Sequence, residues 1–280
     1  MNQMESLEIT QPIRPRPDGK PVQAVQLPEP GEYGFVEQPQ QDPCIPFPPQ
    51  PIMLSEEAAK ALSEELRERK IQFLTHFTRV ENLASIMTHG LLPRSRLVAE
   101  GRARSIRFNE PYLPGAWQDA ISFNISFPNY RLFYNLQEQR GVEWVVLLLD
   151  ASLLLSQPFY YFLFPAANLV QVPSFPIEFA PYLQSVEMFR SLFSDTDNVR
   201  RAYLQIPDNY PTHPQSEVLT FSPIPPSSIL EVHFYNTYKF SQWFLQNTPV
   251  ALTIDKNIWV ESLEYFSPRI DYPHWKSTFR

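Results

Sequence analysis

A glutamine and a glutamate two positions apart open an apolar run at residues 215–221. The alternation that follows Glu217 predicts a strand, and Pro211 and Pro214 predict a loop before it. Side chains two positions apart project from the same face of a strand, so we expect Gln215 and Glu217 to face one cavity. A carboxylate and an amide in that arrangement could hold a sugar.

Three further groups of residues have the composition of a binding site. His76 and Thr78 lie where a predicted strand meets a helix, and the block 125–130 reads Ile-Ser-Phe-Pro-Asn-Tyr. Between them lies a basic segment that contains five arginines and one acidic residue, Glu100. The arginines are Arg94, Arg96, Arg102, Arg104 and Arg107. Arginine suits the binding of phosphate because its planar guanidinium donates two parallel hydrogen bonds.

The elements that position these groups follow from hydrophobic periodicity. Strands are expected at residues 71–77, 120–127, 143–149, 218–224, 229–234 and 258–263. Helices are expected at residues 55–70, after a Thr78–Glu81 capping box up to Gly90, and at 130–140 and 238–246. Strand-helix-strand alternation is incomplete, which favours an α+β fold over a doubly wound sheet.

The composition excludes several classes of protein. One cysteine, Cys44, and five scattered histidines supply no metal-ligand cluster, so no metal is expected. Apolar runs are far shorter than the roughly 20 residues of a membrane span, and no signal peptide is recognisable, so we expect a cytoplasmic protein. A net charge of -7 argues against a basic coat but leaves room for a local basic groove.

The chain divides by composition near residue 54. Residues 1–54 hold 12 of the 30 prolines and are interpreted as a proline-rich N-terminal tail with extended stretches. Within it, Pro46–Pro49 is either a docking peptide or an irregular strap on the surface. Residues 55–280 are expected to form one globular domain.

Taken in chain order, these groups resemble the DarT family of DNA ADP-ribosyltransferase toxins, over roughly residues 71–236. The His-Xaa-Thr segment and the later Gly-Leu pair of that family read here as 76–78 and 90–92. The block 121–134 is similar to the segment ending Ser-Phe-Pro-Asn-Tyr in the guanosine-modifying branch. The catalytic glutamate at the end of a Gln-Xaa-Glu would be Glu217. The loop before it departs from the family, which is usually acidic where this chain has His213.

The resemblance implies an ADP-ribosyltransferase-like fold, with a split mixed or antiparallel sheet and flanking helices, that uses NAD as a substrate. Cleavage of the bond between nicotinamide and ribose passes through an oxocarbenium-like centre, which a carboxylate stabilises. Glu217 is the candidate, against the alternative of a solvated glutamate on an edge strand. Gln215 would orient the nicotinamide ribose or the acceptor base, against that of an exposed loop amide.

The remaining NAD contacts are carried over in the same way. His76 would bind the adenosine-side ribose with support from Thr78, which can also cap the following helix. Arg107, or else Arg104, would bind the pyrophosphate or stabilise the reacting complex as a catalytic residue. The two tyrosines that follow the Ser-Phe-Pro-Asn block, Tyr130 and Tyr134, either stack on nicotinamide or belong to the core.

The expected acceptor is guanine or thymine in single-stranded DNA. Arg94, Arg96 and Arg102 would hold the phosphates while Trp117, with Tyr112, stacks on bases. The resemblance implies a toxin of a toxin-antitoxin or phage-defence system, with an antitoxin or ADP-ribosyl hydrolase as partner. The alternatives are transfer to RNA or protein, and a catalytically silent module that binds NAD or nucleic acid.

Overall fold

The computed structural model describes residues 51–103, 106, 115–138, 141–165, 180–196, 199–252 and 254–275. They all belong to the second of two compact units, which spans residues 43–280. Arg104, Arg107, Tyr112 and the tail up to residue 50 lie outside the described residues, so the roles assigned to them stay predictions.

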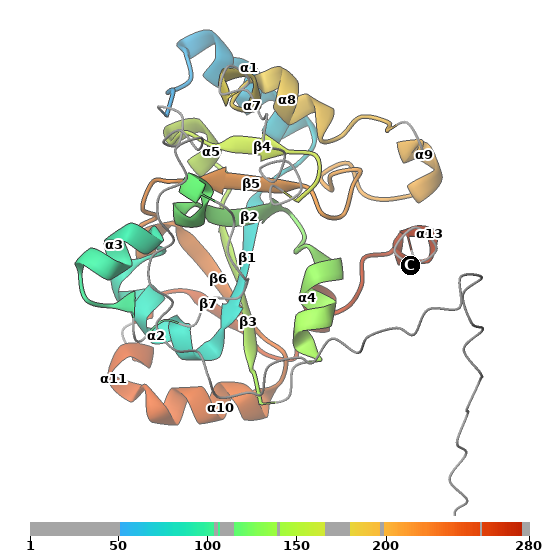
Figure 1. Ribbon diagram of the computed structural model, residues 1–280. Coiled ribbons are helices and arrows are strands. Elements are labelled where there is room, and N and C mark those ends of the chain that lie inside the picture. The colour runs from blue at the N-terminus through green and yellow to red at the C-terminus, as the bar shows by residue number, and fades with distance from the viewer. Residues whose placement is uncertain are drawn as a thin grey trace, which may run out of the picture. The chain divides into compact units, whose positions relative to one another are not determined.

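One seven-stranded sheet organises the described part of the chain (Figure 1), in the order β4-β5-β2-β1-β3-β6-β7. The strands are β1 (Phe73–Arg79), β2 (Ile121–Ile125), β3 (Trp144–Asp150), β4 (Tyr160–Phe162), β5 (Glu217–Thr220), β6 (Ile229–Phe234) and β7 (Asn257–Trp259). Neighbouring strands are antiparallel except β6 and β7, which are parallel. The predicted α+β fold with a mixed sheet is confirmed.

The sheet is split at its centre. β1 pairs with β3 along its whole length, from Phe73 opposite Asp150 to Arg79 opposite Trp144. With β2 it pairs only through Leu74 and Thr75. Beyond Thr75 the two strands part, so the later side chains of β1 can line a space between the two halves of the sheet.

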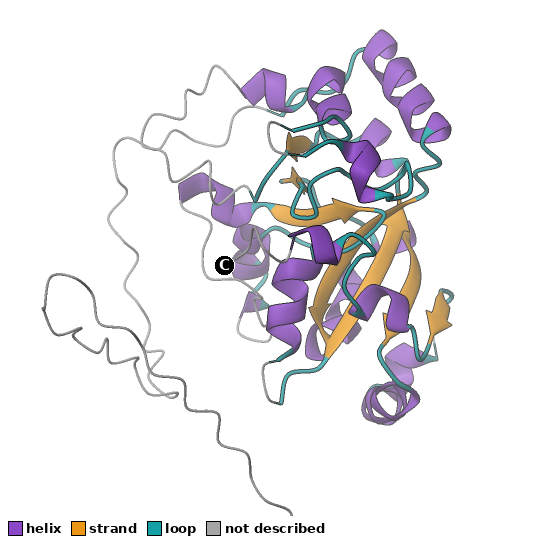
Figure 2. Ribbon diagram, turned by 90° about the vertical axis from the view of Figure 1, so that its right-hand side faces the viewer, coloured by secondary structure: helices purple, strands orange, loops and turns teal. Residues whose placement is uncertain are grey.

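β3 is buried on both faces, which explains its unbroken apolar sequence. Val145, Leu147 and Leu149 join the larger core cluster, while Val146 and Leu148 join a second cluster on the opposite face. That second cluster also contains Phe133 and Leu136 of α4 (Tyr130–Gln137) and Phe266 of α12 (Leu263–Phe266). Figure 2 shows helices on both sides of the strands.

The longer helices agree with the predicted ranges. α1 (Glu56–Glu68) is capped by Ser55, whose Oγ accepts a hydrogen bond from the Ala58 N–H at 3.2 Å. α2 (Val80–His89) ends before Gly90, and α10 (Thr237–Gln246) follows β6. None of the described helices is long and apolar enough to cross a membrane.

Several short helices have no counterpart in the predicted set. They are α3 (Arg94–Ala99), α5 (Leu153–Ser156), α7 (Ala180–Leu183), α8 (Val186–Ser191), α9 (Arg201–Leu204), α11 (Thr248–Ala251), α12 (Leu263–Phe266) and α13 (Tyr272–Trp275), with 3₁₀ turns at Gly115–Asp119 and Pro226–Ser228. Most of these α-helices have only four residues, which is too short for a helical period to emerge from the sequence.

The predicted capping box at Thr78 is wrong. Because β1 pairs with β3 as far as Arg79, Thr78 is a strand residue, and the N-cap of α2 is Arg79 without a side-chain cap. The Thr78 hydroxyl instead accepts a hydrogen bond from Asn82 Nδ2 at 3.0 Å. This bond ties the first turn of α2 to the strand that precedes it.

Glycine is required at position 90, where the backbone leaves α2 and passes close to the backbone of Ile224. Its φ is +82°, and Leu91 next to it exchanges two backbone hydrogen bonds of 2.9 Å with Ile224. A Cβ atom on Gly90 would lie 2.0 Å from the carbonyl oxygen of Ile224. Only glycine allows both this backbone conformation and this close approach.

Gly90→Ala should therefore destabilise the protein much more than Gly141→Ala. Gly141 also has a positive φ, of 75°, but a Cβ there meets nothing within 4 Å, so its cost is limited to about 1–2 kcal/mol of backbone strain. Gly90→Ala adds a clash with backbone, and we expect a loss of at least ~3 kcal/mol. Urea unfolding of both variants measures the difference, and equal losses would contradict the argument.

Candidate active site

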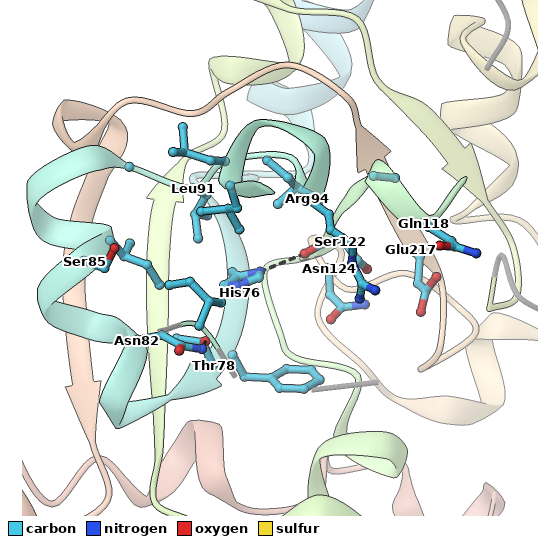
Figure 3. Close-up of a pocket in the computed structure, with 18 of the residues that line it drawn as sticks. His76, Thr78, Asn82, Ser85, Leu91, Arg94, Gln118, Ser122, Asn124 and Glu217 are labelled. Atoms are coloured by element: carbon cyan, nitrogen blue, oxygen red, sulfur yellow. Dashed lines mark hydrogen bonds between the residues drawn. The ribbon is translucent and has the colours of Figure 1, made fainter. Parts of the chain in front are cut away.

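A pocket of about 200 Å³ opens where the sheet is split (Figure 3). Its polar lining comes mainly from β1, β2, β5, α2 and the start of α3. The polar residues that line it are His76, Thr78, Asn82, Ser85, Arg94, Gln118, Ser122, Asn124, Asn129 and Glu217. Leu91, Leu97 and Ile106 are among its apolar walls.

Strand periodicity explains why the pocket residues of one strand occur at a spacing of two. His76 and Thr78 are two positions apart on β1, Ser122 and Asn124 are two positions apart on β2, and each pair faces the pocket. Glu217 is the first residue of β5 and is 6% exposed. The structure thus brings Glu217, His76 and Thr78 into one pocket, although they are far apart in the sequence.

His76 is held in one tautomer by the opposite half of the sheet. Its Nδ1 lies 2.9 Å from the carbonyl oxygen of Ser122, and a carbonyl can only accept, so Nδ1 carries the proton. Burial lowers the pKa of His76 below its ordinary value, although the bond to Ser122 opposes this. The ring is therefore neutral at neutral pH and has Nε2 as an acceptor for a ligand hydroxyl.

Asn124 connects the pocket to the segment that carries Glu217. Its Nδ2 donates to the carbonyl oxygen of Ser216 at 2.9 Å, and its Oδ1 accepts from the Asn129 N–H at 2.9 Å. The side chain is buried, so both bonds are protected from water. Asn124 lies in the block 121–134, and no role was predicted for it, although a polar residue between Phe123 and Ile125 was a signal.

Gln215 does not face the pocket. β5 begins at Glu217, so Gln215 lies in the preceding turn and the period of two does not extend back to it. Its Oε1 accepts a hydrogen bond from Arg131 Nη1 at 2.9 Å. The expected shared face of Gln215 and Glu217 is wrong, while the loop before the strand is as predicted.

The described arginines of the basic segment separate into two groups. Arg94 begins α3 and lines the pocket, where its side chain reaches toward Asn124 (Figure 3). Arg96 and Arg102 lie outside the pocket, and both pair with Glu100, at 2.8 and 2.9 Å. Arg94 is thus a pocket residue, whereas we expected it to bind DNA phosphates together with Arg96 and Arg102.

The predicted aromatic contacts lie elsewhere. Tyr130 is 2% exposed and packs edge-on against Tyr272 at 5.9 Å, while Tyr134 is on the surface, and neither lines the pocket. This favours the core alternative for Tyr130. Trp117 is buried, with T-shaped contacts to Tyr160 and Phe162 at 5.3 and 5.4 Å, so its burial contradicts stacking on bases.

The loop before β5 is clamped by a buried arginine that sequence reasoning missed. Arg269 is 4% exposed and donates to the carbonyl oxygens of Pro211 and Thr212, at 2.8 and 3.1 Å. Asp271 balances its charge through two bonds of 2.8 and 2.5 Å and accepts a third from Trp275 Nε1 at 2.8 Å. The loop is therefore fixed by chain that follows the last strand.

His213 lies in the loop that Arg269 holds. Its ring is 4.7 Å from that of Phe164 and 4.9 Å from that of Trp275, and its Nδ1 accepts from the Gln215 N–H at 3.2 Å. Burial, with the positive charges of Arg269 and Arg131, lowers the pKa of His213 to about 4. His213, at a position that is usually acidic in the DarT family, is therefore uncharged near neutral pH.

No set of three or more metal-ligating His, Cys, Asp or Glu side chains occurs within the described ranges. The pocket instead combines a buried carboxylate, a neutral histidine, an arginine and a series of amides. Such a pocket suits a substrate that carries ribose hydroxyls and phosphates, and its carboxylate can stabilise developing positive charge.

The chain matches a known protein family over most of its length. The model of the family described as "ssDNA thymidine ADP-ribosyltransferase, DarT" matches residues 75–256. This range is more than half of the chain and contains every described polar residue of the pocket. The chain is a DNA ADP-ribosyltransferase by class, and it belongs to the DarT family. The guanosine-modifying branch is not distinguished by this match.

Solved structures of DarT proteins are also similar to the chain. DarT of Thermus sp. 2.9 in complex with NAD+ is 16% identical, with a TM-score of 0.45 over 70% of this chain and 98% of that chain. Thermosipho africanus DarTG in complex with ADP-ribose is 9% identical, with a TM-score of 0.44. That comparison covers 70% of this chain and 51% of the Thermosipho chain. No curated protein matches by sequence.

Acid should destabilise the fold through His213. The unfolded chain takes up a proton on this residue near pH 6.5, and the folded chain only near pH 4, so between these values the unfolded state binds more protons. His213→Gln keeps an acceptor for the Gln215 N–H, and we expect its stability to fall less steeply from pH 6.5 to 4. Urea unfolding at several pH values measures the slopes.

The exposed His274 supplies the matched control. His274→Gln tests the His→Gln change itself at an exposed position, and its slope is compared with that of His213→Gln. His76 and His233 also have lowered pKa values, but they contribute equally to the wild type and to both variants. Identical slopes for the wild type and His213→Gln would disprove the assignment.

Proposed function

We propose that the chain cleaves NAD and transfers its ADP-ribose to a thymine or guanine base of single-stranded DNA. The observation that carries this proposal is the buried carboxylate of Glu217, which shares one pocket with His76 and Arg94. Family membership supports the choice of NAD and DNA. A solved DarT of Thermus sp. 2.9 contains ADP-ribosylated single-stranded DNA, at 16% identity and a TM-score of 0.40.

In the proposed reaction the bond between nicotinamide and the ribose C1 breaks, and its electron pair leaves with nicotinamide. The positive charge that develops on the ribose is stabilised by the carboxylate of Glu217. A ring nitrogen of the unpaired base then forms a new bond to C1, and Glu217 accepts the proton that this nitrogen loses. The products are nicotinamide and an ADP-ribosylated base.

The other pocket residues have roles in binding. Nε2 of His76 accepts a hydrogen bond from a ribose hydroxyl, since Nδ1 is committed to Ser122. Arg94 serves the pyrophosphate from its position in the pocket, beside the contribution proposed for Arg107 or Arg104. Thr78 supports the site through its bond to Asn82. The surface arginines Arg96 and Arg102 contact DNA phosphates, in competition with Glu100.

The biological context proposed is a cytoplasmic toxin that is held in check by an antitoxin or an ADP-ribosyl hydrolase. We further propose that residues 55–280 form the transferase domain and that residues 1–54 are a proline-rich tail. Transfer to RNA or protein is the alternative within the enzymes, and a silent NAD-binding module is the alternative outside them. Assays of nicotinamide release and of DNA modification separate these functions.

Glu217→Gln should abolish release of nicotinamide and modification of DNA. The amide is nearly the same size but has no charge to stabilise the ribose cation, so we expect a loss of at least about 10²-fold. Radiolabelled NAD with an oligonucleotide reports both products. Glu143→Gln, at a partly exposed glutamate that pairs with Lys239 and does not line the pocket, is the control and should retain activity. Activity of Glu217→Gln above a tenth of wild type would refute the assigned role.

Single-stranded oligonucleotides should be modified and the same strands annealed to their complements should not. Extruding a base from a duplex costs a few kcal/mol, which an unpaired base avoids. Four homopolymers, each tested alone and as a duplex and analysed by mass spectrometry, identify the base. Equal modification of both forms would reject the single-strand requirement. Nicotinamide release without DNA modification would favour RNA or protein as acceptor.

Expression of the wild-type chain should arrest the growth of a bacterial host, because modified bases block copying of the genome. Glu217→Gln expressed to the same level should be harmless. Growth curves with immunoblots at matched expression test this. If the wild type leaves growth unaffected although its purified form modifies DNA, the toxin role is wrong while the enzymatic role stands.

A further inference from the structure

The side-chain amide of Asn129 is a buried hydrogen-bond donor in the pocket lining. Asn129 is 2% exposed and lines the pocket, yet its Nδ2 has no hydrogen-bond acceptor among the described residues. The other two asparagines of the pocket lining have theirs, because Asn82 Nδ2 donates to Thr78 and Asn124 Nδ2 donates to Ser216. Buried donors are rarely left unsatisfied, since their lost hydration is then uncompensated.

The remaining polar atoms of Asn129 fix the orientation of this amide. Its Oδ1 caps α4 by accepting from the Leu132 N–H at 3.2 Å, and its own N–H donates to Asn124 Oδ1 at 2.9 Å. Its carbonyl oxygen accepts from the Phe133 N–H at 2.9 Å. Rotating the amide by 180° would set the NH₂ group against the Leu132 N–H, so the cap determines which atom remains available.

The position of Asn129 within the pocket is set by Asn124. The same carboxamide that accepts from the Asn129 N–H donates to the carbonyl of Ser216, the residue before Glu217. Asn129 therefore lies on the Glu217 side of the pocket. If Glu217 acts at the ribose C1, a group on this side meets the half of NAD that contains the reacting bond.

We propose that Asn129 Nδ2 donates a hydrogen bond to an acceptor oxygen on the nicotinamide riboside half of NAD. The inference rests on the proposed function and adds a substrate-binding residue to it. An amide NH₂ requires an acceptor, and this half of NAD offers the carboxamide oxygen and the ribose oxygens. Asn129 thus has two tasks: its Oδ1 starts α4 and its Nδ2 holds the substrate.

The test removes the donor and keeps the helix cap. Asn129→Ser and Asn129→Thr both place a neutral N-cap oxygen at this position and have no amide to reach the ligand. The matched control is Asn236→Ser, because Asn236 caps α10 in the same way, with its Oδ1 accepting from the Lys239 N–H at 2.9 Å. Asn236 does not line the pocket.

Isothermal titration calorimetry with NAD and with ADP, which lacks the nicotinamide riboside, supplies the readout. We expect both Asn129 variants to raise the Kd for NAD by about 3- to 10-fold, the effect of one hydrogen bond, and to change the Kd for ADP by less than about twofold. Their melting temperatures should match that of Asn236→Ser, whose affinity for NAD should equal that of the wild type.

The outcomes distinguish this inference from the function on which it rests. If the wild type binds NAD and the Asn129 variants bind it equally well, the inference alone is overturned. Equal weakening for NAD and ADP would place the contact on the other half of the molecule and also overturn it. If the wild type neither binds NAD nor releases nicotinamide, the proposed function fails first.

Discussion

The buried side chain of Asn124 holds together the parts from which the pocket is built. Its carboxamide accepts from the N-cap residue of α4 and donates to the carbonyl that precedes Glu217. These two bonds connect β2 to a helix on one side and to β5 on the other, at the place where β1 and β2 stop pairing. Loss of this side chain would leave two buried backbone groups unsatisfied, at a cost of about 1–3 kcal/mol each, so no apolar residue can replace it.

A second constraint acts on the loop before β5, and it comes from outside the family match. Arg269 and Asp271 follow the matched range, which ends at residue 256, yet Arg269 donates to carbonyl oxygens at positions 211 and 212. A buried ion pair contributes little net stability, but removal of one partner leaves a buried charge and costs about 3–5 kcal/mol. The pair holds the loop through the two hydrogen bonds that Arg269 donates to its carbonyl oxygens. Arg201 reinforces it through the carbonyl of Tyr210 at 2.6 Å.

Helices and strands with a long hydrophobic pattern were predicted well from the sequence, whereas side-chain contacts were predicted poorly. The strand β3 and the helix α1 were predicted correctly because each depends on neighbouring residues. Gln215 was misplaced because the start of β5 depends on pairing with β2, and its partner Arg131 is 84 positions away. Trp117 was expected to be exposed and to stack on bases, but its ring is buried. The residue types alone do not show which side chains face the core. Asn129 was missed because its free amide becomes evident only once its other bonds are known.

The order of the strands along the chain affects when the pocket forms during synthesis. β1 is synthesised first, but its neighbours in the centre of the sheet, β2 and β3, come later in the chain, and β5 with Glu217 comes later still. A ribosome working at about 5–20 residues per second needs on the order of ten seconds to pass from the first wall of the pocket to the last. Contacts that span such distances also form slowly. A nascent chain therefore has no assembled pocket until most of it has been translated, because Glu217 on β5 is among the last of the pocket residues to be made.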